Sequence, residues 1–347
     1  MKSEKERQHF VPRFYLKKFS NNNDEKSIGV FLKDNKKFIK SASIEGQSQK
    51  PFYYGEDGKV ENLLMEIEGP ASRVFNKICE DCEIIKTPLE DYFRILHFVI
   101  NLYFRNPVQS QTLLNSDDGF NKHFEEFKSS PEIKSLLDNK LTTTQSIILS
   151  LSQSFRIARM CLDLSSKIIV NKTSTPFIIS DNPTLKYNMI ADRSKGVSAG
   201  FASYGLQIFL PITPTTMLLF YDSKAYEIHE DEKDLLHIIK DSEISQLNLL
   251  QVLNSSNCLY FNQDINESDI ISLVNQAKNY RLPNEIIPIK FGGYFLQTIS
   301  ELKINLNLTA INPVTSQQFA IHGKLILPMR QHAKKMKEFL EKEQKKN

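Results

Sequence analysis

Two residues near the start of the chain carry side chains that could act together on a substrate. His9 and Arg13 lie four residues apart in the stretch QHFVPRFYL, residues 8–16. A histidine can act as a general base, a nucleophile or a metal ligand near neutral pH, and an arginine can bind phosphate or carboxylate. This spacing places both side chains on one side, whether the segment is extended or begins a helix at Pro12. Alternatively, His9 bonds a backbone carbonyl and fixes the N-terminal arm on the core.

Carboxylates follow on a predicted helix. Glu61 and Glu68 are seven residues apart. Two helical turns separate them, so they lie on one face with about 10 Å between them along the axis. They could bind a divalent metal ion or pair with Arg13 or Arg105. Arg105 ends an apolar helix just before Pro107 and could also bind a phosphate. The alternatives are a solvated helix face for the glutamates and a helix-end role for Arg105.

A second polar cluster, Ser180-Asp181-Asn182-Pro183, comes directly after the apolar run PFII. It should therefore lie at the end of a strand, where functional sites are often assembled. Asp181 and Asn182 could ligate a hard metal ion, and Ser180 or Asp181 could orient a water molecule. The alternative is an Asx turn, in which the side chain bonds its own backbone.

Gathered in one cleft, these residues would suit a metal-assisted phosphodiester hydrolase of the nuclease type. A carboxylate-bound metal ion, here Mg²⁺ or Mn²⁺, a base and an arginine on the phosphate are the parts that this reaction needs. The predicted catalytic residues are His9, Arg13, Glu61, Arg105 and Asp181. The predicted substrate-binding residues are Tyr54, Ser180 and Asn182. The predicted metal ligands are Glu61, Glu68 and Asp181.

The alternative hypothesis is a non-enzymatic binding or interaction protein. The same residues would then form a buried polar network that holds the N-terminal arm on the core. ADP-ribosyl transfer by His9, Tyr54 and Glu61 is a variant of the enzymatic hypothesis, but their spacing gives it no support. An open cleft lined by these residues would favour the enzyme, and mutual pairing in a closed core would favour the interaction protein.

Apolar periodicity predicts the elements that position these groups. Because Pro12 disfavours a helix through it, an extended entry and a short helix from about Arg13 are expected. A β-hairpin is predicted at 27–32 and 37–41. Helices are predicted at 59–79, with a kink or two abutting helices at Gly69-Pro70, and then at 88–104, 118–138, 143–170, 230–254 and 267–279. Strands are predicted at 175–180, 206–211, 216–221 and 286–289.

This order of elements predicts an α+β fold that is mainly helical with a small, mostly antiparallel sheet. One large domain is expected over residues 1–285, with its helical part at about 59–170 and its strand part at about 175–222. Residues 286–347 should form a C-terminal extension that ends in a basic amphipathic helix.

Six short stretches, taken in this order, resemble a bacterial family known as domain-of-unknown-function family 4238. They are QHFVPRFYLKKF, FYYG, VENLLMEIE, FRNP, FIISDNP and FLPITP. The resemblance spans about residues 8–260 and implies no established chemistry. It does single out the positions His9, Pro12, Arg13, Leu16, Gly55, Glu61, Glu68, Arg105, Ser180, Asp181, Asn182 and Pro183.

The composition of the chain limits which binding partners and which cellular compartment can be expected. The net charge is +3, but residues 1–40 carry 11 Lys and Arg against 5 Asp and Glu, and residues 330–347 carry 7 against 3. These basic ends could contact nucleic acid or an acidic partner, or could simply favour solubility. No apolar run approaches the roughly 20 residues of a membrane span, and no disulfide framework is expected from four cysteines. A cytoplasmic protein without a membrane segment is expected.

Overall fold

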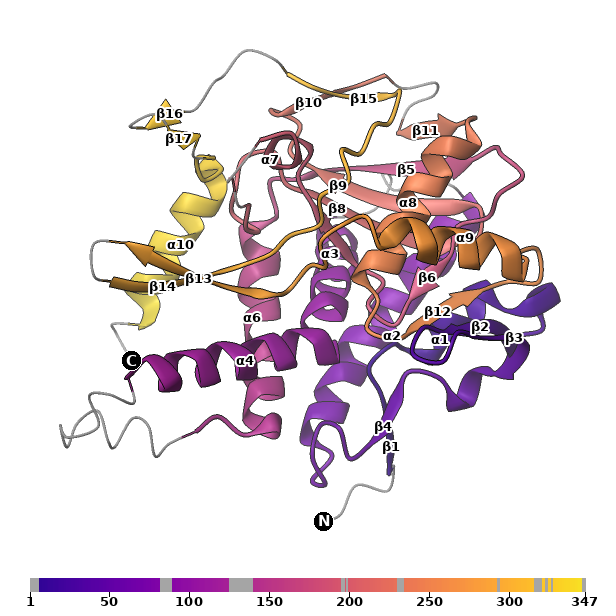
Figure 1. The fold of residues 1–347 in the computed structure, drawn as a ribbon, viewed down its shortest axis with the longest axis horizontal. Helices are drawn as coiled ribbons and strands as arrows, with labels where there is room; N and C mark the ends of the chain where they lie inside the picture. Colours follow the sequence, from indigo (N-terminus) through magenta and orange to yellow (C-terminus); the bar gives the residue numbers. More distant parts are fainter. Residues whose placement is uncertain are drawn as a thin grey trace.

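The computed structural model describes residues 6–81, 89–124, 140–194, 197, 199–229, 234–291, 294–314, 320–321, 324–325 and 327–344. In these ranges the chain folds into helices and several sheets, with mostly antiparallel pairing (Figure 1). The α+β class is therefore confirmed. The expectation of a small sheet is wrong, because the largest sheet has five strands.

The five-stranded sheet has the order β11-β5-β9-β8-β7, and its only parallel pair is β11 with β5. Its strands are β5 (Ser165–Asn171), β7 (Leu185–Tyr187), β8 (Gln207–Thr213), β9 (Thr216–Tyr221) and β11 (Leu235–Ile238). Two of them, β5 and β11, fall where helices 143–170 and 230–254 were predicted. Both predictions fail there because a short apolar run of four to seven residues cannot be told from part of a buried helix by periodicity alone.

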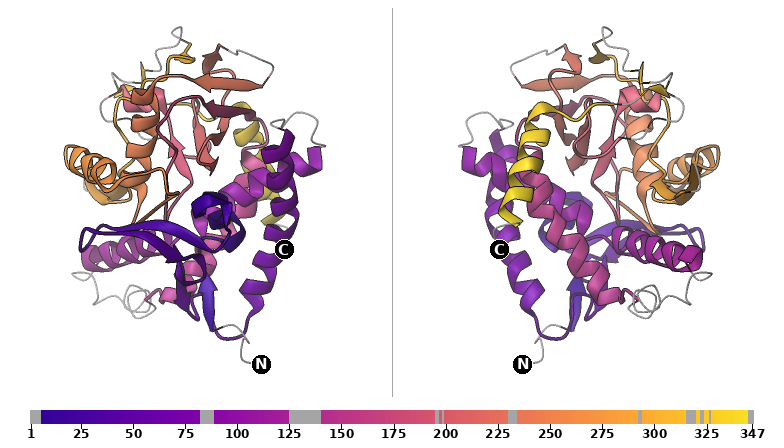
Figure 2. Two further views of the ribbon diagram at one scale, coloured as in Figure 1. Left: turned by 90° about the vertical axis from the view of Figure 1, so that its right-hand side faces the viewer. Right: turned by 90° about the vertical axis from the view of Figure 1, so that its left-hand side faces the viewer.

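Both faces of this sheet are covered. Ile168, Leu210 and Phe220 pack in one core with the helices α2, α3 and α6, whereas Ile169 and Phe209 pack in a second core with α8. Figure 2 shows the strands between these two groups of helices. The sheet is therefore the middle layer of the molecule.

The helices surround the sheets. The first group is α2 (Lys59–Asp81), α3 (Leu89–Phe104), α4 (Pro107–Phe124) and α6 (Thr143–Met160). The second is α7 (Met189–Asp192), α8 (Asp241–Asn254) and α9 (Glu267–Ala277). Of the two alternatives at Gly69-Pro70, two abutting helices are excluded, since α2 runs through Pro70 as one helix. The predicted end of α3 at Phe104 is confirmed, and residues 82–88 and 125–139 lie outside the described ranges.

A four-stranded antiparallel sheet, β3-β2-β12-β6, joins distant parts of the chain. The predicted hairpin is confirmed as β2 (Ser27–Leu32) and β3 (Lys37–Ser43). On the other side of β2 lies β12 (Cys258–Phe261), which in turn pairs with β6 (Ile179–Ser180). This arrangement places the start of the Ser180–Pro183 turn beside the strand that follows α8.

The N-terminal arm is docked as predicted, with an extended entry and a short helix. β1 (Arg7–His9) pairs with β4 (Gln49–Pro51), and α1 (Arg13–Leu16) begins after Pro12. Tyr15 is fully buried and its hydroxyl donates to the Pro211 carbonyl at 2.6 Å. The arm is thereby bonded to strand β8.

The segment beyond residue 285 forms short strands and a helix that contact earlier parts of the chain. Its strands are β13 (Ile286–Phe291), β14 (Tyr294–Ile299), β15 (Ile311–Pro313), β16 (Ala320–Ile321) and β17 (Lys324–Leu325). β15 pairs with β10 (Tyr226–Ile228), and α10 (Gln331–Gln344) contacts α6 (Figures 1 and 2). Among the described helices, none has the length and apolar character needed to cross a membrane.

Candidate functional site

Arg105, at the end of α3, is the centre of one buried polar network. Only 2% of its side chain is exposed. Nη1 donates to Glu68 Oε1 at 2.5 Å, Nη2 to the His9 carbonyl oxygen at 2.6 Å, and Nε to the Tyr54 hydroxyl at 3.1 Å. We call His9, Tyr54, Glu68 and Arg105 the Arg105 network. It joins the N-terminal arm to helices α2 and α3.

The His9 imidazole has a structural contact of its own. Nδ1 donates to the Gln47 carbonyl oxygen at 3.0 Å. Burial lowers the pKa of His9, and the positive charges of Arg13 and Arg105 lower it further. The Gln47 carbonyl opposes this shift. This bond to a backbone carbonyl is the contact that the non-catalytic alternative for His9 describes.

Tyr54 is enclosed by the same network. Its amide donates to Gln8 Oε1 at 2.5 Å, and Gln8 Nε2 donates to the Gly55 carbonyl oxygen at 3.0 Å. Gly55 has a φ of 102°, a conformation that favours glycine. Burial raises the pKa of the Tyr54 phenol, and Glu68 and Glu61 add to that effect against Arg105. The phenol is thus held neutral as a hydrogen-bonding group.

Arg13 lies outside the hydrogen bonds of this network. The Arg13 side chain is half exposed, and its guanidinium lies 3.9 Å from Glu45 Oε1, a contact that contributes little at the surface. Glu61 is half-buried on the first turn of α2. Arg105 is bonded to the His9 backbone carbonyl, and the charge of Arg13 acts on the His9 imidazole from outside the network.

Asp181 is the centre of a second network. Its Oδ1 accepts from the Ser256 amide at 2.8 Å, and its Oδ2 from the amides of Asn257 and Cys258 at 2.8 and 3.0 Å. Burial raises the pKa of Asp181, and the three amide donors oppose that shift by stabilising the carboxylate. Asp181 therefore fixes the segment between α8 and β12.

The neighbours of Asp181 bond to α8. Ser180 Oγ donates to Gln251 Oε1 at 2.8 Å, and Asn182 Nδ2 donates to the Asn254 carbonyl oxygen at 3.3 Å. Asn254 Nδ2 returns a bond to the Asn182 carbonyl oxygen at 2.6 Å. We call Ser180, Asp181 and Asn182 with these α8 partners the Asp181 network. All five side chains are buried.

One residue joins the two networks. Asn106, next to Arg105 in the chain, donates from Nδ2 to the Asp181 carbonyl oxygen. Its Oδ1 accepts from the Val108 amide at 2.9 Å and so caps α4. Seven of the nine predicted site residues are therefore brought together in two buried networks, His9, Tyr54, Glu68 and Arg105 in one and Ser180, Asp181 and Asn182 in the other, while Arg13 is half exposed.

The predicted metal ligands do not fit a metal ion in this arrangement. Glu68 is committed to Arg105, and both oxygens of Asp181 are committed to backbone amides. Over the described ranges, no three His, Cys, Asp or Glu side chains are grouped so that they could hold a metal ion.

Open space lies elsewhere. A polar pocket of about 300 Å³ is lined by Tyr103, Lys186 and Glu301, and an apolar groove of about 480 Å³ lies between α2, α3 and α6. A third cavity of about 580 Å³ lies beside the start of α10. None of these three is lined by a residue of the predicted site.

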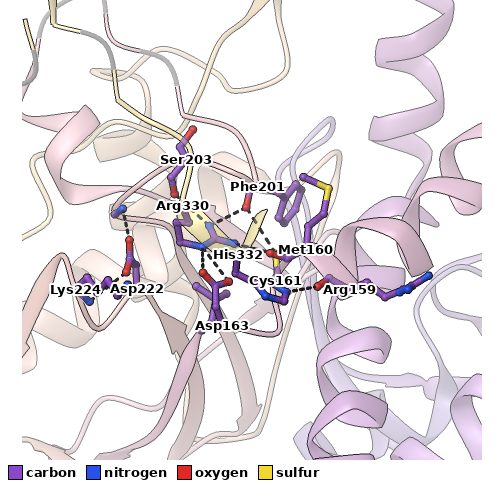
Figure 3. A network of polar contacts seen from close by, with 12 residues as sticks. Arg159, Met160, Cys161, Asp163, Phe201, Ser203, Asp222, Lys224, Arg330 and His332 are labelled. Carbon is purple, nitrogen blue, oxygen red and sulfur yellow. Dashed lines mark hydrogen bonds and ion pairs between the residues drawn. The ribbon is translucent and has the colours of Figure 1, made fainter. Parts of the chain in front are cut away.

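A third network, absent from the sequence predictions, borders the cavity beside α10. Arg330, which precedes α10, is 4% exposed. Its Nε donates to both oxygens of Asp163, Nη1 to the carbonyls of Phe201 and Ser203, and Nη2 to the Met160 carbonyl (Figure 3). The one signal in the sequence was an arginine just before a helix, in PMRQH, and it does not reveal partners about 130 to 170 residues away.

The family comparison agrees with the motifs. Residues 7–264 match the family model described as "Protein of unknown function (DUF4238)". The chain belongs to this family. The DUF4238 match includes every residue of the Arg105 and Asp181 networks, whereas Arg330 and α10 lie beyond it. Searches of curated proteins and of solved structures find no match.

Proposed function

We propose that this chain is a non-enzymatic binding or interaction protein, in which the Arg105 and Asp181 networks hold the fold together. The observation that carries the proposal is the commitment of Arg105, whose three nitrogens all donate to partners inside the chain. A catalytic arginine needs donors that face a substrate. The three backbone amides on the Asp181 carboxylate support the same role for the second network.

The metal-assisted nuclease is the competing hypothesis, and it would require Glu68 and Asp181 to leave these partners. Breaking a buried ion pair or an amide-bound carboxylate costs about 3 kcal/mol or more. A binding protein needs no such rearrangement. Nucleic acid or an acidic partner could still contact the exposed lysines of α10, such as Lys334 and Lys335. On the cysteine content we place the protein in the cytoplasm.

The test compares wild type with Asp181→Asn and Arg105→Lys. Each is incubated with single- and double-stranded RNA and DNA in Mg²⁺ or Mn²⁺, and its unfolding in urea is measured. Glu66→Gln, an exposed change on α2, is the matched control. We expect no cleavage by any of them, a loss of about 3 kcal/mol in both network variants and less than about 0.5 kcal/mol in the control. Cleavage by wild type that both folded variants lose would overturn the proposal.

A further inference from the structure

A polar pocket of about 300 Å³ lies where the part of the chain that matches the family meets the segment beyond it. Tyr103, Gln109 and Lys186 line it from the first part, and Asn284 and Glu301 line it from the second. The volume is at the lower end of the roughly 300–1,000 Å³ that small-molecule sites occupy. These five side chains belong to neither the Arg105 network nor the Asp181 network, so the two networks do not account for the pocket.

An ion pair forms one wall of the pocket. Lys186 Nζ on β7 donates to Glu301 Oε1 at 3.0 Å and to the Ala199 carbonyl oxygen at 2.9 Å. The Lys186 and Glu301 side chains are 20% and 13% exposed, and both residues line the pocket. A second hollow beside the same pair has a volume of about 10 Å³, which is room for one water molecule at most. A ligand can therefore reach the pair from the polar pocket.

The ion pair leaves one donor and one acceptor unused in the described part of the chain. An ammonium group has three N–H donors, and Lys186 bonds two acceptors there. The centre of the Phe201 ring lies 5.9 Å from Nζ, near the limit of a cation–π contact, so the ring does not replace a third acceptor. Glu301 Oε2 accepts from the Ala199 amide at 2.9 Å, and a carboxylate oxygen can accept a second hydrogen bond.

The charges of the lining cancel. Among the described residues that line the pocket, Lys186 and Glu301 are the two that carry a formal charge at neutral pH. Burial works to lower the pKa of Lys186, but the Tyr103 and Glu301 side chains outweigh it and raise that pKa, so the ammonium stays charged. Burial raises the pKa of Tyr103, so its hydroxyl stays protonated. A ligand with a net charge would lose hydration here and meet no opposite net charge in return.

We propose that this pocket binds a small uncharged amide, whose carbonyl oxygen accepts from Lys186 Nζ and whose adjacent N–H donates to Glu301 Oε2. An amide places one acceptor beside one donor, and this is the complement of the groups that the ion pair leaves unused. A carboxylate or ammonium ligand would need several partners for its charge. Pro283, Ile299 and Leu302 also line the pocket and offer an apolar surface to the rest of the ligand.

The amide ligand rests on the proposed function, because it supplies a ligand to a binding protein. Among the described residues, the pocket shares Asn254 with the Asp181 network and none with the Arg105 network. Changes at the ion pair therefore test the pocket without altering a residue of either network.

The test uses four probes that share one ring: benzamide, acetophenone, benzoate and benzamidinium. Their dissociation constants for the full chain are measured by ligand-observed NMR titration, which suits small and weakly bound molecules. We expect benzamide to bind about tenfold more tightly than acetophenone, in which a methyl group of similar size replaces the N–H donor for Glu301. The anion and the cation should each bind more weakly than benzamide, because the charges of the described lining cancel.

Two glutamates in the same part of the chain provide a matched pair. Glu301→Gln removes the negative charge of the ion pair, so the lining becomes positive and the folded variant should bind benzoate more tightly than benzamide. Glu285→Gln, an exposed change outside the lining, should keep the preference of wild type for benzamide.

Equal binding of benzamide and acetophenone by wild type, or no binding of either, would overturn the assignment without any variant. A folded Glu301→Gln variant that still prefers benzamide over benzoate would also overturn it, because the ion pair would then not select the ligand. None of these results bears on the cleavage of nucleic acid, so the two proposals fail separately.

Discussion

The side-chain amide of Asn106 donates to the backbone carbonyl of Asp181, and this one contact connects the two buried networks. Asn106 follows Arg105 directly, so the turn between α3 and α4 carries both the centre of the first network and the residue that bonds Asp181 of the second. The FRNP stretch thus acts as a junction between the N-terminal arm and the turn that follows β6.

Asn106→Ala should cost about 2–3 kcal/mol of unfolding free energy. It removes both the cap on the Val108 amide and the bond to Asp181, worth about 1 kcal/mol each, and it leaves a buried carbonyl unpaired. Asn106→Ser should recover about 1 kcal/mol, because its hydroxyl can cap α4 but is too short to replace the amide at Asp181. Urea denaturation measures both, and equal losses in the two variants would contradict the bridging role.

Arg105 and Glu68 should show strong coupling in a double-mutant cycle. Arg105→Met or Glu68→Met alone leaves one charge of the pair without its partner and should cost about 3–5 kcal/mol. The double variant should cost less than the sum of the two by at least about 1 kcal/mol. Additive losses measured in urea would show that the pair is not coupled.

We expect the free energy of unfolding to depend on pH because two buried histidines stay neutral in the folded state. Burial lowers the pKa of His9 and of His97 in the folded state. In the unfolded chain both histidines take up protons as the pH falls below their ordinary pKa of about 6.5, whereas in the folded chain they remain neutral at that pH. The stabilisation is fully present above that value and is lost as the pH falls below it.

We accordingly expect the melting temperature of wild type to fall as the pH is lowered from about 7.5 to about 5.5. A double variant, His9→Asn with His97→Asn, should show a smaller fall. The amide introduced at position 9 can still donate to the Gln47 carbonyl, so the arm keeps that contact. Thermal melts at fixed ionic strength give the comparison. A wild-type melting temperature that rises toward the acidic end would reverse the expected sign.

Arg330→Lys should release α10 from α6. A lysine cannot bond Asp163, Met160 and Phe201 from one planar group, so buried carbonyls lose their donors. We expect a loss of about 3 kcal/mol and faster hydrogen exchange in α10. Lys335→Gln, an exposed change on the same helix, is the control and should exchange like wild type.

Local signals in the sequence predicted local structure well. Pro12 marked the start of α1, Pro107 marked the end of α3, and Asp34-Asn35 between two strand-like runs marked the β2/β3 hairpin. Each of these features depends on neighbours within a few residues. The family pattern also located most of the residues that form the two buried networks.

Long-range partners were not predictable in the same way. Nothing in the sequence of the Ser180–Pro183 turn indicates that the Asp181 carboxylate accepts hydrogen bonds from the backbone amides of residues 256–258. These amides lie 75 to 77 residues later in the chain. Nothing near Glu68 separates a pair with Arg105 from a metal ligand, since both need a carboxylate on a helix. The sequence shows what chemistry each side chain can do. The packing of the fold decides which group each side chain bonds.

The pairing of β2 with β12 has a consequence for synthesis of the chain. Leu32 lies opposite Cys258, so β2 cannot complete its sheet until the ribosome has added the intervening residues. At about 5–20 residues per second this takes roughly 11–45 s. During that time β2 has no partner strand on the edge that later pairs with β12, and an unpaired edge of this kind can pair with another chain.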